Sequence, residues 1–422
     1  MKKVQFIFLF LSFFTGLAYA DFIGKVIDLD TQKPIVGAII TIDGKVTHTD
    51  GYGKFTILDK TESIAIRAYG YDRREFKDLK TKNFGLKSFT PKALYLSYWA
   101  VSLEKNINRI LKLIDETEAN TVVIDTKSEY GHLAYKGNVA LAKKIGAYKR
   151  TTIKNIDKLI TRLKAKGIYL IARHSVFKDN LLAKKRPNFA IKTKQDKVWI
   201  NREKLAWSDP FVDEVHKYNV ELAKEIASKG FDEINFDYIR FPGKARLKYK
   251  LDNNEKNRVN AISSFLKLAK EELKPYNIFI SADTFGYACW NSNDIKIGHS
   301  LKEMEKYVDY IAPMLYPSGF HTGIANAKNP MEKPYEIINH SLKEAKRRFK
   351  IASVRFRPWL QSFKDYAFDR RHFGAKELRA QINASEDFGS NGWMLWNSGS
   401  KFSKKGLKSS KIERTEIALN DL

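Results

Sequence analysis

The sequence predicts an α/β fold, a (β/α)8 barrel of the TIM type, preceded by a small all-β sandwich. Between residues 92 and 399, eight apolar runs of strand length have helical patterns between them, which is typical of a barrel. Before that, residues 21–80 carry short alternating segments separated by turn dipeptides. A doubly wound open sheet is the alternative for the larger part, but no glycine-rich fingerprint follows its first strand.

Residues 1–20, MKKVQFIFLFLSFFTGLAYA, have the pattern of a secretory signal peptide. Two lysines are followed by an apolar run and then by Ala18-Tyr19-Ala20, a small-residue cleavage site. The run is short for a membrane span, so no stable span is expected and a retained anchor is the lesser alternative. We therefore expect export to the periplasm or the extracellular space. Cys289 is the only cysteine, which excludes an intrachain disulfide.

Residues 21–88 are expected to form the sandwich, with antiparallel strands. Apolar residues alternate in AIITI (38–42), and Asp-Gly turns occur at 43 and 50. The run GKVIDLDTQKPIVGAIITID, followed by TDGYGKF, resembles the carboxypeptidase regulatory-like domain, a transthyretin-like β-sandwich. The resemblance implies an accessory domain without catalytic residues.

A polar linker over residues 79–92 leads into the barrel, which is expected within residues 89–402. Its strands are expected at 92–99, 120–127, 168–177, 231–242, 278–286, 309–318, 352–363 and 391–399. The intervening helices are expected at 103–116, 153–166, 211–229, 256–273, 301–307, 334–348 and 375–386. Ser208-Asp209-Pro210 gives the third of these a cap followed by a first-turn proline. The polar segment 403–422 is expected to be a mobile end.

The fourth strand, FDEINFDYIRFP (231–242), carries polar residues where a buried strand usually carries aliphatic ones. Residues at i and i+2 share a face, so Ile234 and Phe236 would pack under the helices, while Asn235 and Asp237 would point into the barrel. A buried carboxylate without a partner costs several kcal/mol. Active sites of such barrels lie at the carboxyl ends of the strands, so these side chains are expected at that mouth.

The same alternation places polar or aromatic residues on the inward face of the other strands. These are Asp125 and Lys127, Arg173, Ser281 and Asp283, Tyr316, Arg355, Arg357, Trp359 and Gln361, and Trp396 and Asn397. Structural ion pairs of Asp125 with Lys127, or of Asp237 with Arg240, are alternatives to a functional role. His174 lies on the opposite face and is expected to be a hydrogen-bonded core histidine.

Hydrolysis of a glycosidic bond requires two carboxyl groups, and Asp237 and Asp283 can supply them as the catalytic pair. A carboxyl near a cation stays ionised, and a drier one keeps its proton. Arg173 or Lys127 would thus make Asp237 the nucleophile or base and Asp283 the acid, with the reverse still open. The expected substrate-binding residues are Asp125, Lys127, Arg173, Asn235, Tyr316, Arg357, Trp359 and Trp396. Their aromatic members, with Trp99, offer flat apolar faces to sugars.

The net charge of +27 bears on the partner. A basic excess attracts polyanions, or simply reflects a lysine-rich solvated surface. The basic residues are spread along the chain without a nucleic-acid motif, so no nucleic acid partner is expected. The expected partner is a polysaccharide or oligosaccharide, and an anionic glycan is the more specific interpretation. The sequence is silent on the oligomeric state.

Several runs of the barrel region resemble a bacterial family of glycosyl hydrolase domains, (β/α)8 barrels distantly related to α-amylases. They are YLSYWAVS, VVIDTKSEYG, WSDPFVDEVHKYNVELAKEIASKGFDEINFDYIRFP, ISADTFGY and IAPMLYPS, and the resemblance covers roughly residues 93–400. It implies a nucleophile on the fourth strand and an acid on the fifth, the positions of Asp237 and Asp283. Two features depart from α-amylases, because Asn235 stands where they carry arginine and Asp283 where they carry glutamate. The strand also mimics the chitinase pattern DxxDxDxE, but its last acid falls on Ile239.

Two other functions compete with a glycosidase. A non-catalytic glycan-binding barrel of the cell envelope is the first, since a fold does not fix a function. A metal-dependent deacetylase or hydrolase is the second, but the chain has no HExxH motif and its histidines are scattered. We expect neither a metal nor another cofactor.

Overall fold

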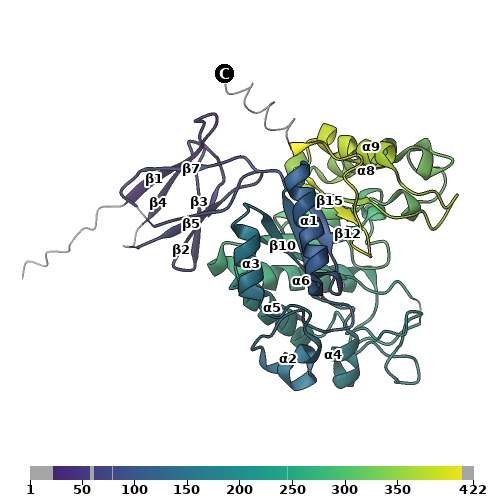
Figure 1. Cartoon of the computed structure of the whole chain (residues 1–422). Coiled ribbons are helices and arrows are strands. Elements are labelled where there is room, and N and C mark those ends of the chain that lie inside the picture. The colour runs from purple at the N-terminus through teal and green to yellow at the C-terminus, as the bar shows by residue number, and fades with distance from the viewer. Residues whose placement is uncertain (1–21, 58–60, 78, 245, 411–422) are drawn as a thin grey trace, which may run out of the picture.

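The computed structural model describes residues 22–57, 61–77, 79–244 and 246–410 (Figure 1). The expected signal peptide and the last twelve residues of the chain, 411–422, lie outside these ranges. Among the helices in the described part of the chain, none is both long and apolar enough to cross a bilayer.

The N-terminal part is all-β, as predicted. Its strands are β1 (Phe22–Asp28), β2 (Ile39–Ile42), β3 (Lys45–His48), β4 (Lys54–Ile57), β5 (Ile64–Arg67), β6 (Arg74–Phe76) and β7 (Asn83–Leu86). They form one sheet in the order β4-β1-β7 and another in the order β3-β2-β5-β6. Inward side chains of both sheets, among them Val26, Ile40 and Phe84, share one apolar core. The prediction of purely antiparallel strands is wrong for one pair, because β1 and β7 run parallel.

The larger part is a closed barrel of parallel strands, which confirms the predicted fold and excludes the open sheet. The strands are β8 (Lys92–Leu96), β9 (Thr121–Lys127), β10 (Tyr169–Ser175), β11 (Glu233–Asp237), β12 (Phe279–Phe285), β13 (Tyr310–Met314), β14 (Trp359–Gln361) and β15 (Trp393–Trp396). They pair in chain order, and β15 closes the ring on β8. β14 is shorter than expected, because the residues before it form a 3-10 helix (Ser353–Arg355) and Pro358 lacks a backbone N–H.

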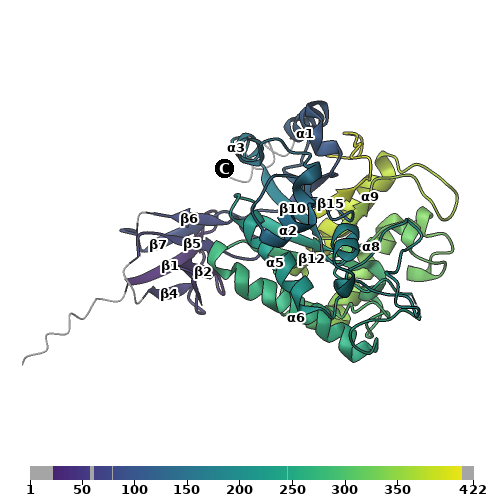
Figure 2. The same cartoon turned by 90° about the horizontal axis from the view of Figure 1, so that it is seen from below.

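Helices cover the outside of the barrel (Figures 1 and 2). They are α1 (Glu104–Glu116), α2 (Ala140–Ile145), α3 (Ile156–Lys164), α4 (Asn180–Lys185), α5 (Asp213–Ala227), α6 (Glu255–Leu273), α7 (Leu301–Met304), α8 (Pro334–Phe349) and α9 (Ala375–Phe388). The short helices α2 and α4 were not predicted. Each lasts only six residues, too short to show a helical period in the sequence.

The strands separate two apolar layers, as their alternation predicts. Outward residues such as Ile234 and Phe236 join the core beneath the helices. Inward residues such as Ile171, Phe279 and Tyr310 fill the inside of the barrel. Because each strand residue alternates between these layers, the polar residues at 235 and 237 point into the barrel.

The sandwich contacts the barrel at the amino-terminal ends of the strands. Arg67 at the end of β5 forms a buried ion pair of 2.8 Å with Asp309, which directly precedes β13. The Gly70 N–H donates to the Tyr310 hydroxyl at 3.3 Å, and the guanidinium of Arg355 stacks 4.4 Å from the Tyr69 ring centre. Both views show the sandwich projecting from one side of the barrel (Figures 1 and 2). These contacts leave the carboxyl-end mouth uncovered by the sandwich.

Residues 403–410 are not a free end, in contrast to the prediction. The Arg379 side chain donates to the Gly406 carbonyl at 2.9 Å, and the Lys408 N–H donates to the Glu118 carboxylate at 2.8 Å. Leu407 of this segment also packs against the core beneath the helices.

Candidate active site

Asp237 is the last residue of β11 and lies at the carboxyl-end mouth of the barrel. Its side chain points inward, as predicted, and the residue is 7% exposed. Tyr238 follows with a φ of +51°, in the left-handed region, and its N–H donates to Asp237 Oδ1 at 2.5 Å. This conformation costs a residue with a Cβ about 1–3 kcal/mol. The turn therefore holds strain at the point where it fixes the orientation of the carboxylate.

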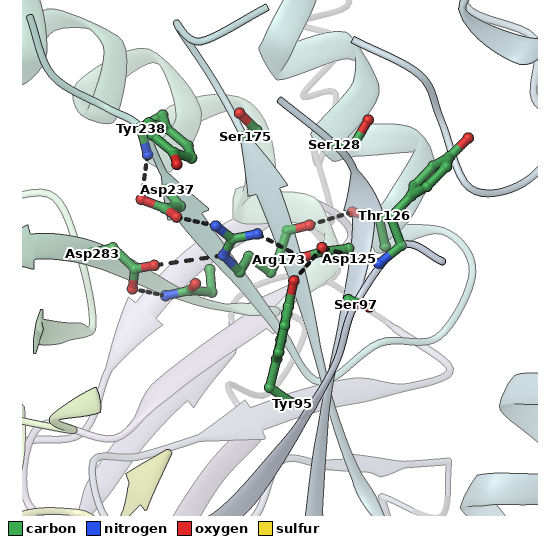
Figure 3. Close-up of polar contacts among 12 residues, drawn as sticks. Tyr95, Ser97, Asp125, Thr126, Ser128, Arg173, Ser175, Asp237, Tyr238 and Asp283 are labelled. Carbon is green, nitrogen blue, oxygen red and sulfur yellow. Dashed lines mark hydrogen bonds and ion pairs between the residues drawn. The ribbon is translucent and has the colours of Figure 1, made fainter. Parts of the chain in front are cut away.

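Arg173 on β10 connects three carboxylates (Figure 3). Its guanidinium forms ion pairs with Asp125 at 2.6 Å and with Asp237, and its Nε lies 4.0 Å from Asp283 Oδ2. The guanidinium carbon also lies 4.9 Å from the ring centre of Trp396. These contacts stabilise the cation and hold it beside the carboxylate of Asp237.

Asp283 on β12 is drier than Asp237, with 2% of the residue exposed. Its Oδ1 accepts hydrogen bonds from Asn235 Nδ2 at 2.8 Å and from the Trp359 indole N–H at 2.7 Å. Burial, followed by the charge of Asp237, raises the pKa of Asp283 well above its ordinary value. The environment thus favours a protonated Asp283, and an acid that keeps its proton beside a second carboxyl group is what a glycosidase requires.

Asp125 on β9 holds Arg173 in place. Its carboxylate accepts from the Tyr95 hydroxyl at 2.5 Å and from the Tyr98 N–H at 3.1 Å, in addition to the ion pair with Arg173. Burial raises the pKa of Asp125, although Arg173 and Tyr95 act in the opposite direction. Because the Asp125 carboxylate already accepts from Tyr95, Tyr98 and Arg173, it orients the arginine and is not a free carboxylate.

The aromatic residues lie at different depths. Trp359 is buried and orients Asp283 through its N–H, so it does not present a free face. Trp396 is half-buried, with its ring 4.1 Å from that of Tyr95. Tyr316 is half-buried, and burial, followed by Asp283 and Asp237, raises the pKa of its phenol well above the ordinary value. Trp99, at 59% exposure, lies near the end of β8 with its ring in T-shaped contact with that of Tyr98.

Lys127 does not lie in the site, so the prediction that it shares the face of Asp125 is wrong. The register of β9 against β10 pairs Asp125 with Arg173 but Lys127 with His174, so one residue is skipped. This bulge turns Lys127 outward. Its ammonium forms a fully buried ion pair of 2.7 Å with Asp179 and donates to Asn219 on α5 at 2.8 Å. The alternative pair with Asp125 does not form. His174, also bonded to Asn219, is the core histidine that was predicted.

Arg357 lies at the opposite end of the barrel from the carboxylate pair. It forms a buried ion pair with Glu233, the first residue of β11, and donates to the side chain of Asn391 at 2.7 Å. The prediction that it contacts substrate is therefore wrong. Its position before β14 begins places it at the amino-terminal end.

Asn235 lies in the site but is fully buried, and its amide donates to Ser281 and Asp283.

Two residues of the site, Tyr95 and Tyr238, were not predicted from the sequence. Tyr95 could have been found, because it shares the inward face of β8 with Ala93. The left-handed turn at Tyr238 has no sequence signal, because a tyrosine rarely adopts it.

Within the described residues, no group of three or more His, Cys, Asp or Glu side chains is arranged to hold a metal.

Comparisons with known proteins bear on the barrel. Among solved structures, a hypothetical protein from Ruminiclostridium thermocellum is 35% identical over 45% of this chain and 96% of its own, with a TM-score of 0.42. The PgaB glycoside hydrolase domain of Bordetella bronchiseptica is 13% identical over 74% of this chain and 95% of its own, with a TM-score of 0.55. An alpha-L-fucosidase of Paenibacillus thiaminolyticus is 12% identical over 78% and 50%, with a TM-score of 0.50.

The two likenesses at low identity concern the fold alone. No curated protein matches the chain. The family model described as "Putative glycosyl hydrolase domain" matches residues 93–402, which include the whole barrel from the second residue of β8 onward. The chain therefore belongs to this glycosyl hydrolase domain family.

Proposed function

We propose that the protein is an exported glycoside hydrolase that cleaves O-glycosidic bonds of a polysaccharide or oligosaccharide with two carboxyl groups. The observation that carries the proposal is the unequal environment of the pair on neighbouring strands. Asp237 is paired with Arg173, while Asp283 is drier and has a raised pKa. Export rests on the pattern of residues 1–20, and the sandwich is proposed as an accessory domain of the carboxypeptidase regulatory-like type.

In this mechanism Asp283 gives its proton to the glycosidic oxygen as the bond to the anomeric carbon breaks. The Asp237 carboxylate then either bonds to the anomeric carbon or takes a proton from the attacking water. Arg173 holds Asp237 in an ion pair before the reaction, and the Tyr238 N–H fixes one of its oxygens. Asn235 and Trp359 hold Asp283 in position through its other oxygen.

The test is release of reducing sugars from a panel of cell-envelope and extracellular polysaccharides. We expect Asp237→Asn and Asp283→Asn each to lower the rate by about 10²–10⁴-fold. Asp157→Asn on the exposed side of α3 is the matched control, since Asp157 makes only a surface ion pair with Lys229. Equal rates for wild type and Asp237→Asn on a substrate that is cleaved would refute the assignment.

One observation favours a second function, a glycan-binding barrel without catalysis. Asp237 is engaged in an ion pair, and both carboxyl groups are nearly buried in this structure. Oligosaccharide binding without any release of reducing sugars from the panel would support this alternative.

A further inference from the structure

A groove of about 450 Å³ opens beside the carboxylate pair. Two loops form it, one within residues 199–207 and one within residues 238–244, which follow β10 and β11 respectively. Loops that follow strands lie at the carboxyl-end mouth of a barrel. The groove is therefore on the same end of the molecule as Asp237.

Tyr238 joins the groove to the candidate active site. Its backbone N–H donates to Asp237, and the residue also lines the groove. Figure 3 shows Tyr238 directly beside Asp237. A sugar chain that passes Asp237 toward this side would place its next unit in the groove.

The lining of the groove combines aromatic rings with cations. The rings belong to Trp199, Trp207 and Tyr238, and the cations are Lys178, Arg202, Arg240 and Lys244. Glu203 is the only carboxylate of the lining, and it pairs with Lys178 at 2.5 Å. Three positive charges remain without an opposite charge in the groove.

Arg240 is the most informative of these cations. Its guanidinium carbon lies 4.9 Å from the ring centre of Trp207 and 4.7 Å from that of Phe285, and its only hydrogen bond within the described residues goes to the Phe241 carbonyl. The alternative ion pair with Asp237 does not form, because Asp237 pairs with Arg173. Burial lowers the pKa of Arg240, although Asp237 and Glu203 in its vicinity act in the opposite direction.

Arg202 and Lys244 are exposed at the edge of the groove, and neither makes an ion pair in the part of the chain that the structure describes. The rings of Trp207, Tyr238 and Phe285 hold the Arg240 guanidinium in place, so its remaining donors are oriented before a ligand arrives. Such a fixed fork suits the paired oxygens of a carboxylate, sulfate or phosphate. The rings of Trp199 and Tyr238 suit the apolar face of a sugar.

We infer that this groove binds an anionic sugar unit, one that carries a carboxylate, sulfate or phosphate group, next to the position of bond cleavage. Its place beside a cleaved bond rests on the proposed function, whereas binding itself does not require hydrolysis. In this inference the cations that line the groove select an acidic glycan. The net charge of the whole chain does not identify which residues would do so.

The test is calorimetric titration of the full chain with oligosaccharides of equal length. The probes are oligogalacturonate for the carboxylate, a sulfated and a phosphorylated oligosaccharide, and a neutral malto-oligosaccharide. We expect at least one acidic probe to bind about tenfold or more tighter than the neutral one. Added salt should weaken this binding, since exposed cations contribute to it. The acidic probe that binds identifies the source of the charge.

Arg240→Gln should weaken binding of the acidic probe about tenfold or more without affecting the neutral one. The double variant Arg202→Gln/Lys244→Gln changes only exposed side chains and repeats the test if Arg240→Gln fails to fold. Arg347→Gln on α8 is the control, since Arg347 pairs with Glu344 on the surface. Equal binding of acidic and neutral probes, no binding of any probe, or unchanged affinity in the double variant would overturn the inference.

The two proposals fail separately. If Asp237→Asn abolishes hydrolysis of a neutral glycan and the groove variants change nothing, the glycosidase stands and the groove inference falls. If acidic probes bind through the groove but no glycan is cleaved, the groove inference stands and the glycosidase falls.

Discussion

Replacing Arg173 by glutamine tests whether one cation holds the site together. The substitution removes the guanidinium that contacts Asp125, Asp237 and Asp283 and leaves three nearly buried carboxyl groups facing one another. Loss of one partner of a buried ion pair typically costs about 3–5 kcal/mol. Two unit charges 4 Å apart attract each other by about 4 kcal/mol at an effective dielectric constant of 20, which lies in the same range. We therefore expect the free energy of unfolding at pH 8 to fall by about 3–5 kcal/mol.

The destabilisation should depend on pH, and its sign follows from the carboxyl groups. Burial already raises the pKa of Asp125 and of Asp283 above their ordinary values, and loss of Arg173 raises both further. A raised pKa in the folded state favours folding at low pH, and this contribution is lost as pH rises through that pKa. The difference between Arg173→Gln and wild type should thus be smaller at pH 5 than at pH 8.

Urea unfolding followed by tryptophan fluorescence measures this difference for the barrel alone, because all seven tryptophans lie between residues 99 and 396. Arg162→Gln on α3 is the control, since Arg162 pairs with Glu104 at the surface and should change stability by less than about 1 kcal/mol. The double variant Arg173→Gln/Asp237→Asn should recover part of the loss. Equal destabilisation at pH 5 and pH 8 would show that Arg173 acts by packing and not by charge.

Three further outcomes follow from the same contacts. Asp283→Asn keeps an oxygen acceptor for Asn235 and Trp359 and removes a carboxyl group whose pKa is raised, so urea unfolding at pH 8 should show it at least as stable as wild type while hydrolysis is lost. Trp359→Phe removes a donor that favours the ionised form of Asp283, so the basic limb of the pH–rate profile should move to higher pH; a shift to lower pH would contradict this role. Lys127→Met leaves Asp179 buried without its ion pair, so the unfolding free energy should fall by about 3–5 kcal/mol. The KM of the folded enzyme should be unchanged, and a changed KM would indicate that Lys127 does contact the substrate.

The alternation of strand residues was enough to find most of the candidate site. Asp125, Arg173, Asn235, Asp237 and Asp283 all lie inside the barrel because the side-chain period of a strand is two. The same reasoning fails where the backbone breaks the period. The bulge between Asp125 and Lys127 shifts the parity by one residue and moves Lys127 into the layer beneath α5, and a bulge leaves no clear mark in a single sequence.

Depth along the barrel axis is a second quantity that alternation does not supply. Arg357 and Trp359 lie two residues apart, yet Arg357 binds Glu233 at the amino-terminal end and Trp359 donates to Asp283. Depth depends on where each strand begins relative to its neighbours, which is a property of the register between strands. Boundaries of strands read from one sequence are uncertain by a few residues, and this error is as large as the distance that separates the two roles.

The register between β10 and β11 also explains how Arg173 reaches Asp237, although the residue two positions before Asp237 is the uncharged Asn235. Arg173 pairs directly with Asn235 across the two strands, so a guanidinium reaches Asp237 from the neighbouring strand at the same level. Asn235 donates to Asp283 instead. A cation on β10 and an amide on β11 thus supply each carboxyl group with a donor. Residues 62 positions apart along the chain share this task, and only the folded register brings them together.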